Sequence, residues 1–191
     1  IISIHIPIIL AIFIPLVLGW KYPAIFSPVH VILLELIMGP TCSIIYENEP
    51  AERNTMIEPP RTSSETFFSW KEISTSIFQG LMITGGLLFI YQYAVGQGHS
   101  ESLTRAMVFT TLMISNIFLT LVNRSFYYSI WTTLTYKNML VPIIIGITSF
   151  ILGALLLFEP LTQFFQLEQL NIQQLGISLL VGTLSVLWYE T

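Results

Sequence analysis

Long apolar runs separated by short polar stretches make up most of this chain. A helix needs about 20 apolar residues to cross a bilayer core of roughly 30 Å, and six windows of about that length carry few charges. They are residues 1–19, 28–46, 73–95, 106–122, 139–158 and 170–189. Within each window the apolar positions are continuous, whereas strands of a membrane β-barrel alternate apolar and polar residues. The pattern predicts an all-α membrane protein, a bundle of six transmembrane helices.

The longest polar stretch, residues 47–72, holds six of the eleven glutamates. Threading six spans places this stretch on the same side of the membrane as residues 124–138 and the C-terminus. That side carries five Lys and Arg residues against two on the other, namely Arg53, Arg61, Lys71, Arg124 and Lys137 against Lys21 and Arg105. By the positive-inside rule the five-charge side is cytoplasmic. We therefore expect residues 47–72 to form a cytoplasmic loop.

Composition supports a lipid environment and removes several kinds of chemistry. The chain is 53% hydrophobic and 9% charged, which excludes an ordinary soluble domain and a disordered one. A net charge of −4 with seven basic residues leaves no basic surface for nucleic acid. The single cysteine, Cys42, excludes an internal disulfide and a metal site built from several cysteines. Ile1 already lies inside an apolar run, so the chain reads as part of a longer one.

Glu35 is the charged residue nearest the middle of a predicted span. An ionisable group at that depth costs on the order of 3 kcal/mol, so it normally faces the bundle interior and serves a function. Pro40, which follows Gly39, has no N–H and cannot bond the carbonyl of Leu36. A freed carbonyl near a carboxylate suits a hard cation, which makes Glu35 a candidate metal ligand beside a helix break. The alternative is a protonated or paired Glu35 next to a simple kink.

His5 and Asn116 complete the set of candidate ion-binding residues. His5 lies two residues before Pro7, which interrupts the helical hydrogen bonds again. Its imidazole could ligate a metal, relay a proton, or only hydrogen-bond between helices. Asn116 belongs to a row of polar residues in the fourth window, and such residues join helices more often than they bind ions. The predicted site therefore combines Glu35, His5 and Asn116 with breaks at Gly39, Pro40 and Pro7.

Residues 28–61 resemble the sixth membrane helix and following loop of P-type cation-transporting ATPases of the calcium-pump class, bacterial type. The likeness rests on Pro28-Val29-His30, Glu35, Gly39-Pro40-Thr41-Cys42-Ser43, Glu49-Pro50, Met56 and Pro59-Pro60-Arg61. The six windows match the fifth to tenth membrane helices of these pumps in number, length and loop sizes. The resemblance implies that residues 1–191 are the C-terminal transmembrane domain of such a pump, in a bacterial plasma membrane.

The resemblance further implies the membrane half of an ATP-driven cation pump that contributes part of the ion-translocation site. The phosphorylated aspartate of a DKTGT motif and the nucleotide-binding domain would belong to the remaining N-terminal portion, which is the expected partner besides the lipid bilayer. ATP and Mg²⁺ would act only there, and this chain alone would not be catalytic.

The positions of the calcium ligands in these pumps correspond here to His5, Ile8, Glu35, Met38 and Gly39. Most of the oxygen ligands that calcium requires are thus missing. The transported cation is left open as calcium, another cation or a proton. The alternative function is a self-standing six-span protein, channel-like or a scaffold, without ATPase activity.

Overall fold

The computed structural model describes residues 2–49, 70–124 and 138–190, and the regular elements in these ranges are all helices. They are α1 (Ile2–Val17), α2 (Pro28–Glu47), α3 (Trp70–Gly96), α4 (Glu101–Val122), α6 (Leu140–Leu157), α7 (Glu159–Phe164), α8 (Ile172–Leu187) and the 3-10 helix η1 (Trp188–Glu190). A helix occupies each of the six predicted windows, which confirms the all-α class. Most of the loop expected at 47–72 lies outside the described residues, and its side of the membrane stays a prediction.

Four of these helices, α2, α3, α4 and α6, are long and apolar enough to cross a bilayer by length and composition. The other two long helices, α1 and α8, are apolar but have 16 residues each. At 1.5 Å per residue they reach about 24 Å, a little less than the hydrocarbon thickness. The protein is therefore an integral membrane protein with four clear spans and two shorter apolar helices packed beside them.

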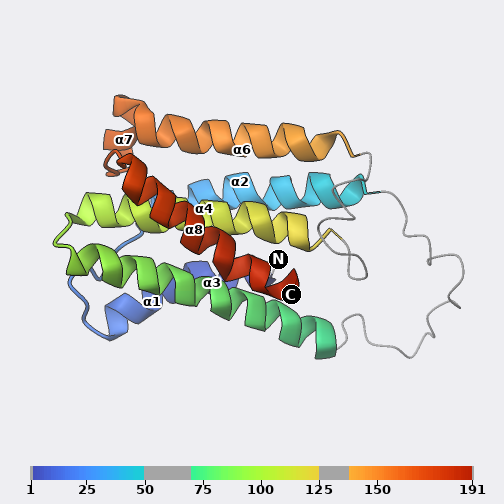
Figure 1. Ribbon diagram of the computed structural model, residues 1–191, viewed down its shortest axis with the longest axis horizontal. Coiled ribbons are helices and arrows are strands. Elements are labelled where there is room, and N and C mark those ends of the chain that lie inside the picture. The colour runs from blue at the N-terminus through green and yellow to red at the C-terminus, as the bar shows by residue number, and fades with distance from the viewer. Residues whose placement is uncertain (1, 50–69, 125–137, 191) are drawn as a thin grey trace, which may run out of the picture.

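The bundle is built around α4, which runs through its centre (Figure 1). This helix packs against α3, α8 and α6, and α1 packs against α3. In consequence 83% of the α4 span is buried, against 33% for α2 and 28% for α6. The links between α1 and α2, between α3 and α4, and from α6 through α7 to α8 all lie at one end of the bundle (Figure 1).

Small residues let the central helices approach closely. A Cβ added at Gly182 of α8 would lie 2.9 Å from the carbonyl oxygen of Thr111 on α4, so the two backbones are nearly in contact there. The Ser115 hydroxyl then donates to the Gly182 carbonyl at 3.1 Å and lies 3.0 Å from the Ser185 hydroxyl. Membrane helices associate through this combination of tight packing and hydrogen bonds, because lipid supplies no hydrophobic driving force between them.

Local sequence explains where several helices begin. Ser100 accepts a hydrogen bond from the Leu103 N–H and caps α4, and Asn171 forms a capping box with Gln174 at the start of α8. At the start of α2, Pro28 occupies the first turn, where its missing N–H costs nothing. These caps fix the helix ends that lie in the short links of the bundle.

Candidate functional site

The predicted residues His5 and Glu35 lie next to each other on α1 and α2. His5 Nε2 is 3.2 Å from Glu35 Oε1, and the two side chains are 44% and 42% exposed. The contact is an ion pair when His5 is protonated and a hydrogen bond when the neutral ring carries its proton on Nε2. Glu35 therefore lies at the edge of the bundle, in contact with a second ionisable group, and not sealed in the interior.

The helix faces around this pair are apolar and open. On α1 the exposed side chains Ile9, Phe13 and Leu16 follow one another at helical spacing, and on α2 Ile32 and Leu36 flank Glu35. Residues three and four apart share one face of a helix, so each helix presents an apolar stripe that carries one ionisable residue. The polar pair is thus set in an apolar surface that the described part of this chain does not cover.

The prolines beside the site do not break the helices, which corrects the expectation for Pro7 and for Gly39 and Pro40. Helix α1 runs through Pro7 and α2 runs through Pro40 without interruption. A proline removes one helical hydrogen bond, and the bonds on either side keep the helix continuous. Directly after Pro40, the Thr41 hydroxyl donates to the Ile37 carbonyl one turn earlier. What remains is the Leu36 carbonyl without its usual N–H donor, one turn before Pro40.

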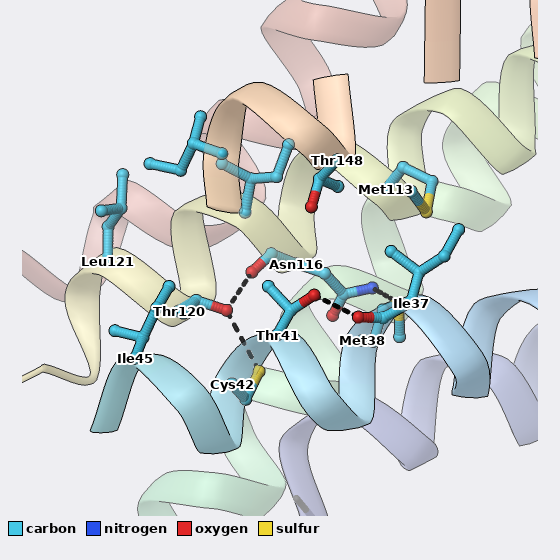
Figure 2. A pocket seen from close by; sticks show the side chains of 12 residues that line it. Ile37, Met38, Thr41, Cys42, Ile45, Met113, Asn116, Thr120, Leu121 and Thr148 are labelled. Atoms are coloured by element: carbon cyan, nitrogen blue, oxygen red, sulfur yellow. Dashed lines mark hydrogen bonds between the residues drawn. The ribbon is translucent and has the colours of Figure 1, made fainter. Parts of the chain in front are cut away.

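Asn116 lies at a different place from the His5 and Glu35 pair. Its side chain is buried between α4 and α2, where Nδ2 donates to Met38 Sδ at 2.8 Å and to the Leu112 carbonyl at 2.9 Å. Figure 2 shows Asn116 and Thr120 of α4 in contact with Met38 and Cys42 of α2, and all four residues line one small cavity. The structure thus brings two of the three candidate ion-binding residues, His5 and Glu35, together. The third, Asn116, lies on α4 and contacts α2 at Met38.

Within the described ranges, no three His, Cys, Asp or Glu side chains gather as a metal cluster. Glu35, the predicted metal ligand, offers two carboxylate oxygens beside the His5 ring. A calcium ion takes six to eight oxygen ligands, so a hard cation at Glu35 would need further groups from outside these two side chains.

Sequence reasoning missed two buried arginines by counting them as loop charges. Arg124 Nε lies 2.6 Å from Glu49 Oε1, and the two side chains are only 2% and 11% exposed. Asn138 Nδ2 also donates to Glu49 Oε1 at 2.9 Å, which ties the ends of α2 and α4 to the start of α6. At the opposite end Arg105 donates to the Ile25 carbonyl at 2.7 Å. Arg105 also pairs with Glu101, four residues earlier on the same helix. The Ile25 carbonyl and Glu49 come from distant links, so a place beside a span does not predict that these arginines are buried.

His30 is a second structural residue at that opposite end. Its Nε2 lies 2.7 Å from the Phe165 carbonyl, and its Nδ1 lies 2.7 Å from the Ser27 hydroxyl. A carbonyl can only accept, so Nε2 carries the proton and Nδ1 accepts from Ser27. His30 is therefore a buried helix cap that also fixes the link between α6 and α8, and it has no free nitrogen for an ion.

Comparison with known proteins gives a consistent set of relatives. Calcium-transporting ATPase 1 of Lactococcus lactis is 31% identical over 117 residues, which are 61% of this chain and 13% of that protein. Calcium-transporting ATPase type 2C member 2 of mouse is 27% identical over 167 residues, 85% of this chain and 17% of that protein. The chain thus spans less than a fifth of the length of these relatives. The family model described as "Cation transporting ATPase, C-terminus" matches residues 23–191, and this chain belongs to that family, the C-terminal membrane region of the cation pumps.

Proposed function

We propose that this chain is the membrane part of an ATP-driven cation pump and that the His5 and Glu35 pair contributes to its ion-translocation site. The observation that carries the proposal is the 3.2 Å contact between an imidazole and a carboxylate on two neighbouring membrane helices. It occurs in a member of a cation pump family whose relatives are named for calcium transport. Phosphorylation and ATP binding with Mg²⁺ would come from the remaining part of the pump, which is several times longer than this chain.

The exposure of the pair supports this assignment. Ionisable side chains at membrane depth are costly against lipid and normally face protein or a water-filled cavity. His5 and Glu35 are nearly half exposed on a surface otherwise made of large apolar side chains. Helices from the N-terminal part of the pump would cover this surface, and the pair would then line a path between them and α1 and α2.

The groups around Glu35 favour a single cation or a proton. They are too few to form a complete calcium site from this chain alone. Glu35 and the Leu36 carbonyl are oxygen donors within one turn, whereas Met38 and Gly39 add no carboxylate. Calcium, which the relatives' names specify, would need several oxygens from the missing helices. A proton would need only the imidazole and carboxylate already in contact. The pump is proposed to act in a bacterial plasma membrane, with residues 47–72 facing the cytoplasm.

The test uses the full-length protein that carries this chain, in reconstituted vesicles. ATP hydrolysis and phosphoenzyme formation are measured while calcium, other cations and pH are varied one at a time. Glu35→Gln keeps the size and a hydrogen bond to His5 but removes the charge, so the apparent affinity for the stimulating ion should fall on the order of tenfold, or about 1.4 kcal/mol.

Glu47→Gln is the matched control, because Glu47 ends the same helix with an exposed side chain. Equal ion dependence of the two variants would remove Glu35 from the site. A full-length protein whose phosphorylation responds to no cation would remove the pump assignment itself.

A further inference from the structure

Two matched pairs of side chains face each other across the contact between α2 and α4. Met38 and Cys42 are one turn apart on α2, and Asn116 and Thr120 are one turn apart on α4, so each pair lies on one helix face. Asn116 Nδ2 donates to Met38 Sδ at 2.8 Å, and Cys42 Sγ lies 3.2 Å from Thr120 Oγ1. Both sulfur atoms are therefore held in place by polar groups of the neighbouring helix (Figure 2).

These four residues line a small apolar cavity together with a third sulfur-containing residue, Met113. The chain has six methionines and one cysteine, and three of these seven residues line the cavity. The cavity has a volume of about 20 Å³, enough for one water-sized particle, which needs roughly 10–15 Å³. The space thus fits a single bare ion or one water molecule.

One polar atom of a lining residue, Asn116 Oδ1, has no hydrogen-bond partner among the described residues. Asn116 is 4% exposed, so this acceptor is buried. A buried acceptor left unsatisfied costs about 1–3 kcal/mol, so a native structure normally supplies something for it to bind. The sulfurs cannot do so with their own hydrogens, because Met38 and Met113 have none and Cys42 already lies against Thr120.

We propose that this cavity binds one soft monovalent cation of the Cu(I) class, with Cys42 Sγ and Met38 Sδ as the principal ligands and Asn116 Oδ1 beside them. As the ion enters, the Cys42 S–H bond breaks, an Sγ–Cu bond forms, and the proton leaves to solvent; no electron is transferred. Asn116 Nδ2 and Thr120 Oγ1 act as positioning groups for the two sulfurs. The site is separate from the His5 and Glu35 pair, which does not line this cavity.

Charge and ligand type both favour a soft monovalent ion over a hard divalent one. Thiolate and thioether sulfur select Cu(I), whereas Mg²⁺ and Ca²⁺ require oxygen. The lining contains no carboxylate or other charged side chain. One thiolate neutralises Cu(I) completely but leaves a divalent ion with a net positive charge in an apolar interior, which is strongly unfavourable.

The experiment measures Cu(I) bound to the full-length protein without oxygen, in competition with a coloured Cu(I) chelator. Because other parts of that protein can hold thiols of their own, the readout is the difference between variants. Cys42→Ser, which keeps a hydroxyl to pair with Thr120, should bind one Cu(I) fewer per protein. Thr120→Val removes the group that positions Cys42 Sγ. Loss of such a partner should weaken, by about 10–100-fold, the affinity for the one Cu(I) that Cys42→Ser loses.

Met82→Leu is the control, because Met82 lies on α3, is 39% exposed and is outside the cavity; this variant should bind like the unchanged protein. If Cys42→Ser fails to fold, Met38→Leu retains the thiol and should show the weakened affinity alone. Equal Cu(I) binding by the unchanged protein and the folded variants would overturn the proposal. The proposal would also be overturned if Cys42→Ser bound one Zn(II) fewer than the unchanged protein but the same amount of Cu(I).

Discussion

Two ion pairs join different helices in the described residues, and they differ in almost every physical respect. Arg124 and Glu49 are 2% and 11% exposed, lie 2.6 Å apart and share Asn138 as a third partner. His5 and Glu35 are 44% and 42% exposed and lie 3.2 Å apart on an open apolar face. The first pair is enclosed by this chain alone, whereas the second is not.

The difference separates a structural role from a functional one. A buried, fully bonded pair holds one arrangement, because either charge left alone would cost several kcal/mol. A half-exposed contact between a histidine and a carboxylate can be broken, or either group can take another partner, at little cost. The enclosed pair therefore fastens the ends of three helices, and the open pair is the one that can take part in transport.

The largest effect is expected from Arg124→Met in the full-length protein. The substitution keeps much of the apolar volume of the side chain but leaves Glu49 buried without its cation. Breaking a buried pair in this way typically costs about 3–5 kcal/mol, so the free energy of unfolding in detergent should fall by that amount. Lys71→Met, at an exposed position at the start of α3, should change it by less than about 0.5 kcal/mol.

If Arg124→Met and Lys71→Met had similar free energies of unfolding, the Arg124 and Glu49 pair would not stabilise the fold. A second measurement sharpens the point, because Glu49→Gln combined with Arg124→Met removes both charges. Residues in one hydrogen-bonded network do not act additively, so the double variant should lose less stability than the sum of the two single losses.

A smaller effect is expected where the helices are packed most tightly. Gly182→Ala places a Cβ 2.9 Å from the Thr111 carbonyl oxygen, and overpacking of this kind costs typically about 1–3 kcal/mol. Gly176→Ala lies on the same helix with nothing within 4 Å of the new Cβ, so it should be neutral or slightly stabilising. Thermal unfolding of both variants measures the difference. If Gly182→Ala is as stable as Gly176→Ala, α4 and α8 do not pack as closely as described.

The helices of this protein could be predicted from sequence, but their arrangement could not. The apolar windows are a local property, and each of the six contains a helix. Which helix becomes central depends on contacts between distant segments, so the enclosure of α4 and the open face of α2 could not be predicted from the apolar windows alone. Glu35 was recognised as unusual from its depth alone, while its contact with His5 on another helix depends on how α1 and α2 are placed.

The same limit explains the residues that were misjudged or overlooked. Arg124 and Arg105 flank a predicted span, a position typical of loop charges. Glu49 and the Ile25 carbonyl, which bind them, lie far away along the chain, and Glu101 is a local partner of Arg105 alone. Cys42 was considered only as an isolated thiol, since its neighbour Thr120 is 78 positions away. Pro40 was expected to interrupt α2, although the loss of one hydrogen bond leaves the helix continuous.

The smallest stability effect is expected at the open pair, and it completes the comparison. A double-mutant cycle with His5→Gln and Glu35→Gln in the full-length protein should give a coupling energy of about 0–1 kcal/mol in unfolding, the value typical of exposed pairs. The same variants should nevertheless alter ion-stimulated phosphorylation on the order of tenfold, because a charge is removed where an ion is bound. A coupling of several kcal/mol would mean that the rest of the pump buries this pair as firmly as Arg124 and Glu49 are buried here. In that case the open face would be a structural contact, and the path of the ion would have to lie elsewhere in the membrane part.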